Sequence, residues 1–300
     1  MAREITLLPC VEIEPKKRAP RDRSKPTVAF TQGVPRRYRF AFEKVGPSAF
    51  VSHLDLLRLL PRIFRRLELP LFYSQGFHPK PDLTFGPALS LGIASLCEHF
   101  DARITADLDL DGLADRLTAN APPGIRFRQV QRLDDGDPSI AKILADDGLA
   151  RWVVGVPVTA LPDAGFLFPR AEGEAWVDAL RREIDGQLDG GRLTVMRTIE
   201  GIGKKIDVRA FLRGVRVGVG AEALAGAGVV GDLVPIEVDT ALSGTGGVRI
   251  GEVVEALLGK DLPHRAVRVA MWATKRQERV TPMNLAALRR DAAVSVAAEE

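Results

Sequence analysis

Three side chains that can exchange or orient protons lie in one short stretch of the chain: His53, Asp55 and His78. Histidine titrates near neutral pH, and a nearby carboxylate can orient it, so the three could form a general acid–base site. Alternatively, Asp55 follows Ser52 by three residues, which is the spacing of a helix capping box and explains this carboxylate without catalysis. The spacing is not typical of a metal site, and we expect no bound metal.

Aromatic rings, positive charge and hydrogen-bonding groups alternate just after this point, at Tyr73, Ser74, Gln75, Phe77, His78, Lys80 and Phe85. Single-stranded RNA is bound by stacking bases on such rings while cations contact the phosphates. A simpler interpretation is that the rings cover the edge of the core and that Lys80 is merely solvated. The glycines and prolines among these residues predict an irregular loop.

A helix is predicted over residues 53–68, with a bend or break near Pro61. Its apolar face is predicted from Leu54, Leu57, Leu60, Phe64 and Leu67, and its cationic stripe consists of Arg58, Arg62, Arg65 and Arg66. Such a stripe is usually a solvated helix face. Here Glu68 is the nearest acidic residue after it, so the stripe could also bind phosphates with a salt-dependent affinity.

Two groups of elements position these residues. In the first, strands are predicted at 37–45, 69–74, 98–105 and 125–133 and helices at 53–68 and 109–122. In the second, strands are predicted at 152–158, 193–200, 204–212, 215–220 and 266–273 and helices at 173–188 and 249–259. The first order, β-α-β-β-α-β, is that of a ferredoxin-like domain. We therefore expect an α+β protein of two tandem ferredoxin-like domains, each with its own antiparallel sheet.

The domain boundaries follow from composition. We expect a disordered basic N-terminal arm at 1–35, a first domain at 36–135, a linker at 136–150, a second domain at 151–275 and a flexible C-terminal tail at 276–300. The basic run KKRAPRDRSK in the arm lacks hydrophobic periodicity, so it is either a solvated linker or a nucleic-acid-binding arm.

Composition excludes several classes of protein. The chain has 300 residues, 46% hydrophobic and 27% charged, with a net charge of +3. No apolar run approaches the ~20 residues of a membrane span, so we expect a cytoplasmic protein. Nucleotide-binding glycine loops, nucleophile elbows and zinc-protease helices are missing, and no cofactor is predicted. Cys10 and Cys97 are too few to hold the iron–sulfur cluster of a radical SAM enzyme.

The motifs SHLDLLR, LPLFYSQGFHPKP, LTFGPALSLG and EHFD lie between residues 52 and 101. In these motifs the chain resembles a bacterial family of radical SAM-linked proteins, whose members occur alone or fused behind a radical SAM protein with a cobalamin-binding-type domain. The resemblance covers residues 37–105 closely and continues more loosely to about 275. It implies a radical SAM enzyme as a partner in trans, but no established activity.

Together these observations predict an accessory protein that binds an RNA substrate, tRNA or ribosomal RNA, for its partner. Phosphates would contact Arg58, Arg62, Arg65, Arg66 and Lys80, a base would contact Tyr73, Gln75, Phe77 or His78, and the partner would dock on the helix face around Leu56 and Ile63 or on the second domain. One alternative is an RNA-processing or RNA-modifying enzyme that uses His53 or His78. The other is a protein–protein adaptor that binds no nucleic acid.

Overall fold

The structure is a computed structural model that combines helices and strands along the whole described chain. It describes residues 32–75, 77–145, 147–162, 170–191, 193–199, 201–242, 247–259 and 262–291. The first half contains β1 (Arg36–Lys44), η1 (Gly46–Phe50), α1 (His53–Arg66), β2 (Leu83–Phe85), β3 (Ala94–Ile104), α2 (Leu113–Ala119) and β4 (Ile125–Leu133). The predicted arm lies outside the described residues up to position 31.

The second half begins inside the segment that the sequence predicts as a linker. Its elements are α3 (Ile140–Leu144), β5 (Gly148–Pro157), η2 (Val158–Ala160), α4 (Trp176–Asp189), β6 (Thr194–Ile199), β7 (Ile202–Asp207), β8 (Leu212–Val217), α5 (Ala221–Gly226), β9 (Leu233–Ala241), α6 (Ile250–Leu258), β10 (Arg265–Lys275) and β11 (Glu278–Val280). Residues 136–150 thus hold α3 and the start of β5 rather than a plain connection, because Ser139 caps α3 and the apolar side chains of Ile140 and Ile143 are buried.

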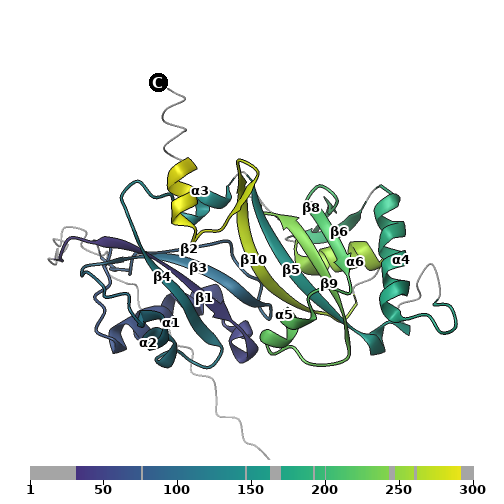
Figure 1. Cartoon of the computed structure of the whole chain (residues 1–300), viewed down its shortest axis with the longest axis horizontal. Helices are drawn as coiled ribbons and strands as arrows, with labels where there is room; N and C mark the ends of the chain where they lie inside the picture. Colours follow the sequence, from purple (N-terminus) through teal and green to yellow (C-terminus); the bar gives the residue numbers. More distant parts are fainter. Residues whose placement is uncertain are drawn as a thin grey trace, which may run out of the picture.

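One continuous sheet crosses both halves, where the sequence predicts two. Its order in the described chain is β4-β1-β3-β10-β5-β9-β8, with β2 paired to β3 and β11 to β10. Figure 1 shows β10 lying between β3 and β5 at the centre of the molecule. The mixed α+β composition and the mostly antiparallel pairing are confirmed, but two separate sheets are not. The strand β10 makes the difference, because it pairs with β3 of the first half and β5 of the second.

The contact of β10 with β3 is short and parallel. It pairs Val267 with Ala94 and Arg268 with Ser95, whereas β10 pairs with β5 along most of its length. Consecutive residues of β10 are buried on both of its faces, as expected of a strand that is covered on both sides. The two halves are therefore joined through the side chains of β10 more than through its ladder to β3.

Aromatic packing builds the core of the first half. Phe40 of β1 stacks on Phe100 of β3 with ring centroids 4.8 Å apart, and Phe64 of α1 meets Phe40 edge-on at 5.3 Å. The second half has an aliphatic core under α4 and α6, and a third small cluster around Val45, Val153 and Val267 lies at the junction. Each half thus has its own core, and β10 connects them.

Three further segments differ from the sequence prediction. Residues 69–74 form no strand: they make only isolated bridges, Leu71 with Ile104 and Tyr73 with Pro81, and β2 occurs later in the chain. The strands β6 and β7 form a separate two-stranded ribbon rather than part of the main sheet. Residues 278–291, within the predicted flexible tail, form β11 and a helix whose Arg289 donates to Asp137 at 2.7 Å. At Leu71 and Arg289 a long-range contact overrides the local pattern, whereas the ribbon is a local hairpin that stays outside the main sheet.

Charged side chains are buried where the halves meet. The Arg39 guanidinium donates to Asp101 and to the carbonyl oxygens of Pro138 and Pro282, which ties β1 to the segments before α3 and after β11. Arg268 of β10 donates to Glu98 of β3 at 2.5 Å. Buried ion pairs stabilise only when their hydrogen bonds are well satisfied, so these contacts define the junction geometry more than they add stability.

The start of β4 approaches the end of β1 closely at Gly124, and a substitution there tests this contact. Its φ of +91° lies in the left-handed region, and an added Cβ would lie 2.1 Å from the Val45 carbonyl oxygen. We expect Gly124→Ala to lower the free energy of unfolding by about 2–4 kcal/mol, measured by urea denaturation. Gly112 also has a positive φ but nothing within 4 Å, so Gly112→Ala should cost only about 1 kcal/mol. Equal losses would contradict the steric argument.

His99 makes the stability of the fold sensitive to acid. Burial, opposed by Glu98 and helped by Arg39 and Arg268, lowers the pKa of His99 from 6.5 to about 4. Between these values the unfolded chain takes up a proton and the folded chain does not, so stability falls as the pH falls. The pKa difference corresponds to about 3 kcal/mol. Urea denaturation at pH 7 and 4.5 should show a smaller acid loss for His99→Gln than for the wild type. Equal losses would show that His99 is not the cause.

Candidate nucleic-acid interface

The helix α1 begins with a complete capping box. The Ser52 hydroxyl accepts a hydrogen bond from the Asp55 backbone N–H at 3.1 Å, and the Asp55 carboxylate accepts one from the Ser52 backbone N–H at 3.2 Å. The Ser52 hydroxyl also donates to Asp55 at 2.6 Å, and these bonds from Ser52 hold the pKa of Asp55 below its usual range. Asp55 therefore has a structural role that accounts for its position.

The buried face of α1 consists of Leu56, Leu60, Ile63 and Phe64. Leu54, predicted to be buried, is exposed, and the helix continues through Pro61 without a break. The prediction that a partner docks on Leu56 and Ile63 is wrong, because both side chains pack into the core of the first half. The hydrophobic spacing in the sequence allows either Leu54 and Leu57 or Leu56 and Ile63 to face the core. The packing of Phe64 against Phe40 and Phe100 turns Leu56 and Ile63 inward.

The four predicted arginines lie on the exposed side of α1. Arg58 reaches only 4.0 Å from Asp55, and Arg66 donates to the Asn120 carbonyl oxygen at 3.0 Å. The side chains of Arg62 and Arg65 make no ion pair or hydrogen bond with the part of the chain that the structure describes. The centre of the stripe thus carries positive charge that no described carboxylate neutralises.

Arginines elsewhere on the described surface are mostly neutralised. Arg151 donates to Asp239 through two nitrogens at 2.8 Å, and Arg197 donates to Glu252 at 2.6 Å. Arg128 donates to Glu43 at 2.6 Å. An arginine that is paired with a carboxylate attracts an external phosphate only weakly. The helix α1 differs from these surfaces because it has cations available for a ligand.

The predicted loop forms a narrow projection between residues 73 and 81. Its base is closed by Gln32, whose side-chain amide donates to the Tyr73 carbonyl oxygen at 2.8 Å and accepts from the Tyr73 N–H at 2.7 Å. Ser74 and Lys80 then hydrogen-bond across the loop. Gly76 lies outside the described residues.

The tip of this loop exposes its functional groups. Phe77 is 72% exposed, and its ring lies 6.2 Å from that of His78. Gln75 and Lys80 are exposed as well, while Tyr73 is half-buried at the base. The exposed ring of Phe77 is thus available to stack against a ligand.

The three predicted acid–base residues are not assembled into one site. His53 packs its ring edge-on against Phe85 at 4.8 Å, and His78 is at the loop tip against Phe77. In the described chain neither imidazole has a hydrogen-bond partner, and Asp55 is engaged by Ser52. A histidine acting as a general base needs an orienting partner or a substrate within hydrogen-bond reach, and the geometry supplies no such partner.

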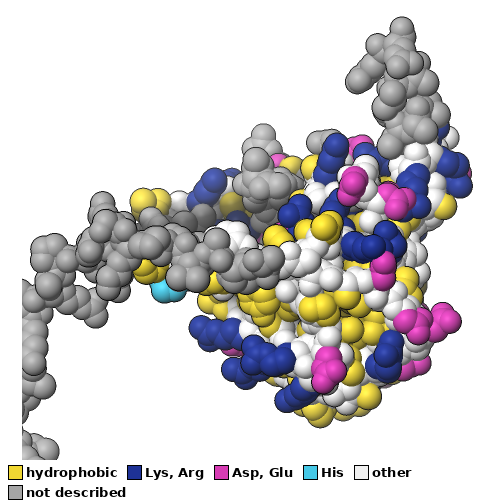
Figure 2. Space-filling model, turned by 90° about the vertical axis from the view of Figure 1, so that its left-hand side faces the viewer, with side chains coloured by type: hydrophobic (Ala, Val, Ile, Leu, Met, Phe, Trp, Pro, Cys, Tyr) yellow, Lys and Arg dark blue, Asp and Glu magenta, His cyan; other side chains and the backbone are white. Residues whose placement is uncertain are grey.

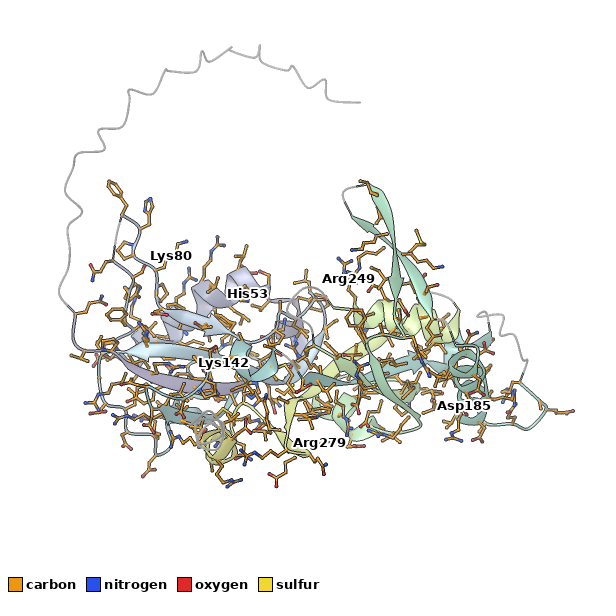
Figure 3. The ribbon with its side chains drawn as sticks, turned by 90° about the horizontal axis from the view of Figure 1, so that it is seen from above. His53, Lys80, Lys142, Asp185, Arg249 and Arg279 are labelled. Carbon is orange, nitrogen blue, oxygen red and sulfur yellow. The ribbon has the colours of Figure 1, made fainter. Side chains whose placement is uncertain are left out.

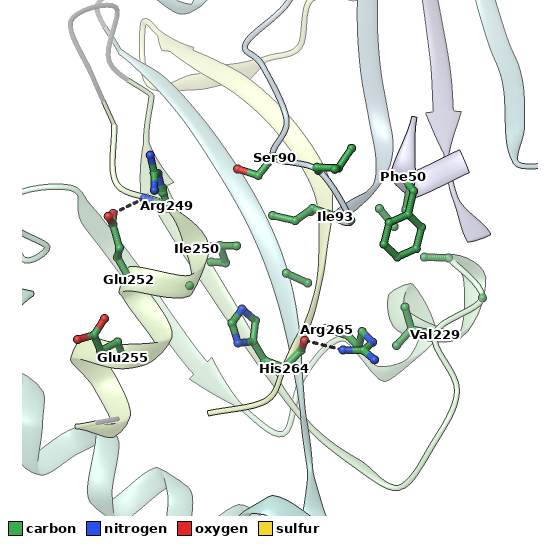
Figure 4. Close-up of a pocket in the computed structure, with 18 of the residues that line it drawn as sticks. Phe50, Ser90, Ile93, Val229, Arg249, Ile250, Glu252, Glu255, His264 and Arg265 are labelled. Carbon is green, nitrogen blue, oxygen red and sulfur yellow. Dashed lines mark hydrogen bonds between the residues drawn. The ribbon is translucent and has the colours of Figure 1, made fainter. Parts of the chain in front are cut away.

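A cleft of about 1000 Å³ opens between the two halves, and sequence reasoning did not find it. Its walls come from η1, the loop before β3, the β6–β7 ribbon, the turn after α5 and the start of α6. Figure 4 shows Arg249 and Glu252 on one wall, Phe50 and Val229 on the other, and Ser90 and Ile93 between them. These segments are far apart in sequence, so only the sheet order brings them together.

The cleft walls combine exposed apolar and charged groups. Phe50, Leu91, Met196 and Val230 all line it and are more than half exposed. Arg249 and Arg265 add positive charge, while Arg197 is neutralised by Glu252. Gly201 and Gly203, which predict a tight turn, lie in the turn and second strand of the ribbon, and Lys204 and Lys205 follow them.

The start of α1, the loop and the cleft lie along one side of the molecule. Figure 3 shows Lys80 on the loop, His53 at the start of α1 and Arg249 at the cleft along that side, with Arg279 on the opposite side. Figure 2 shows Lys and Arg side chains in separate groups rather than over a uniform basic face. Positive charge is therefore concentrated locally.

Two features are absent from the described part of the chain, a cluster of metal-ligating side chains and a membrane-spanning helix. No three His, Cys, Asp or Glu side chains come close enough there to hold a metal ion. None of its helices is long and apolar enough to cross a membrane. The chemistry that these residues offer is binding by stacking, apolar contact and cationic hydrogen bonds.

The fold and site define an α+β protein with a cationic helix, a projecting aromatic loop and a cleft between two halves of one sheet. The chain belongs to the bacterial family described as "Uncharacterized protein conserved in bacteria (DUF2344)", whose model matches residues 37–239. The match includes α1, the loop and β3 but ends before α6 and β10. No curated protein matches the chain. The family description names no radical SAM partner and no ligand.

Proposed function

We propose that the chain is an accessory protein that binds an RNA, tRNA or ribosomal RNA, and presents it to a radical SAM enzyme acting in trans. The observation that carries the RNA part is the exposed arginine stripe of α1, in which the side chains of Arg62 and Arg65 have no described partner, together with the exposed aromatic tip of the loop. The radical SAM part rests on the resemblance of motifs such as SHLDLLR and LPLFYSQGFHPKP to radical SAM-linked proteins.

The geometry suits a flexible strand of RNA. Arg58, Arg62 and Arg65 recur along the same side of α1 and span about 10 Å of helix, so they can contact successive phosphates. At the loop tip, Phe77 and His78 offer rings on which bases stack, and Lys80 offers a further cation. Arg66 is partly engaged by Asn120 and would contribute less than Arg62 or Arg65.

We further propose that residues 36–133 form a ferredoxin-like unit. The order β1-α1-β2-β3-α2-β4 and the antiparallel pairs β1–β4, β1–β3 and β2–β3 support this assignment. Its helix α1 then covers the sheet from one face, and its exposed side is the one that carries the arginines. In the second half the separate β6–β7 ribbon departs from that pattern.

A protein–protein adaptor is the second candidate, and the cleft favours it. Phe50, Leu91, Met196 and Val230 expose apolar surface on facing walls, as at docking sites for other proteins. As an adaptor the chain would bind a protein at the cleft and no RNA along α1, so the two candidates exclude each other. They differ in salt dependence, because apolar docking is little affected by salt and phosphate binding is strongly weakened by it.

The RNA proposal is tested with the double variant Arg62→Glu/Arg65→Glu in the full chain. Binding to fluorescent single-stranded RNA, measured by anisotropy over a series of salt concentrations, should weaken at least about tenfold. The plot of log affinity against log salt should also become shallower by about 1.4, because each phosphate contact contributes about 0.7 to the slope.

The matched control reverses the same charge twice in the second half. Arg209 and Arg213 are exposed and form no ion pair with the described chain, so Arg209→Glu/Arg213→Glu changes net charge equally. It should bind RNA as the wild type does. Equal loss in both variants would indicate non-specific attraction, and no binding by the wild type would overturn the RNA proposal and favour the adaptor. RNA cleavage lost in His53→Ala and His78→Ala would instead support an enzyme.

A further inference from the structure

A second cavity, of about 620 Å³, lies behind the cleft and shares Ser90, Ile93, Arg249 and Ile250 with it. It is lined by α3, the loop that follows β2, the end of β9 and the start of α6. Its size is within the range of about 300–1000 Å³ that small-molecule sites occupy. None of the residues predicted from the sequence as functional, apart from Phe85, contributes to it.

The walls are mostly apolar. Phe85, Leu144, Trp152 and Val248 contribute rings and aliphatic groups. The Trp152 indole N–H is already used, because it donates to the Thr240 hydroxyl at 2.9 Å. Within the described chain no acceptor is found for the Thr240 hydroxyl proton, which leaves one neutral donor at this wall. A ligand here would bury an apolar body.

Arg268 supplies a charged group to the same wall. Its side chain is only 1% exposed, and its guanidinium lies over the Trp152 ring at 5.5 Å. Nε and Nη2 donate to Glu98, and Nη2 also donates to the Pro87 carbonyl oxygen. Nη1 has no hydrogen-bond partner among the described residues. A buried guanidinium with an unused N–H group in a cavity is the usual way to hold an anionic oxygen.

The charges around Arg268 leave a local excess of positive charge. Lys44 is also buried beside Glu98 and donates to the carbonyl oxygens of Ala49 and Val51. Two cations thus face one carboxylate, and burial together with Arg268 lowers the pKa of Lys44 while Glu98 raises it. The neighbouring His99 adds no charge at neutral pH, because its pKa is lowered to about 4. A bound monoanion would balance this group.

We propose that this inner cavity binds a small carboxylate with an aromatic or aliphatic body, whose carboxylate oxygen accepts a hydrogen bond from Arg268 Nη1. The apolar part would pack against Trp152 and Leu144, and Thr240 can donate to a second oxygen. The site is separate from the RNA surface and does not depend on it. The cavity adjoins the cleft, because Ser90 and Arg249 line both.

The probes are indole-3-acetate and octanoate, each compared with its primary amide. Isothermal titration calorimetry on the full chain should show that at least one carboxylate binds and that its amide binds at least tenfold more weakly. Ala141 of α3 is exposed and lines the cavity, so Ala141→Trp should fill it and weaken carboxylate binding at least tenfold. Ala225→Trp, on the exposed face of α5, should bind as the wild type does.

Arg268→Met keeps a long side chain against Trp152 and should abolish the preference for carboxylate over amide. Because this variant also loses the contact with Glu98, its folding is checked by thermal unfolding, and Ala141→Trp provides the test that does not disturb Glu98. Three results would each overturn the proposal: no carboxylate binds the wild type, amides bind as well as carboxylates, or Ala141→Trp binds as the wild type does.

Discussion

The insertion of β10 between β3 and β5 is the constraint on which the remaining structure depends. Its ladder to β3 contains only two residue pairs, so the backbone contributes little to joining the halves. Buried side chains carry the junction instead, with Val267 and Val153 on one face and Arg268 over Trp152 on the other. Because packed interiors tolerate little displacement, this arrangement holds the two halves in one relative position.

The short pairing also explains the cavities. Beyond Arg268 and Ser95 the strands β10 and β3 diverge, and β2 takes the place of β10 beside β3. The loop from 86 to 93 runs across the opening with small residues, including Gly86, Ala88, Ser90 and Gly92. Small side chains cannot fill the space between the halves, so the outer cleft and the inner cavity remain on either side of Ser90 and Ile93.

Local sequence patterns predicted where helices and strands form better than they predicted which strands pair with one another. The capping residues Ser52 and Asp55 located the start of α1, because this signal depends on neighbours in sequence. The run at 69–74 has strand-like composition, yet it bridges β3 only at Leu71. The place of β10 could not be predicted, since its apolar residues are compatible with either an edge or a central position until the partner strands are known. The arginine stripe was predicted for the same local reason that α1 was, and the two cavities were missed because their walls come from distant segments.

Arg268 links the junction to a possible function of the inner cavity. Burying a guanidinium costs several kcal/mol, and apolar residues of similar size can often replace a buried ion pair without loss of stability. The contact with Glu98 offsets part of this cost, but Glu98 also faces Lys44, so one carboxylate serves two buried cations. A core designed for stability alone would be better packed with an apolar side chain at position 268. The cost is easier to explain if the unused Nη1 group meets an anionic oxygen, because the same charge that weakens the empty junction would then stabilise the occupied one.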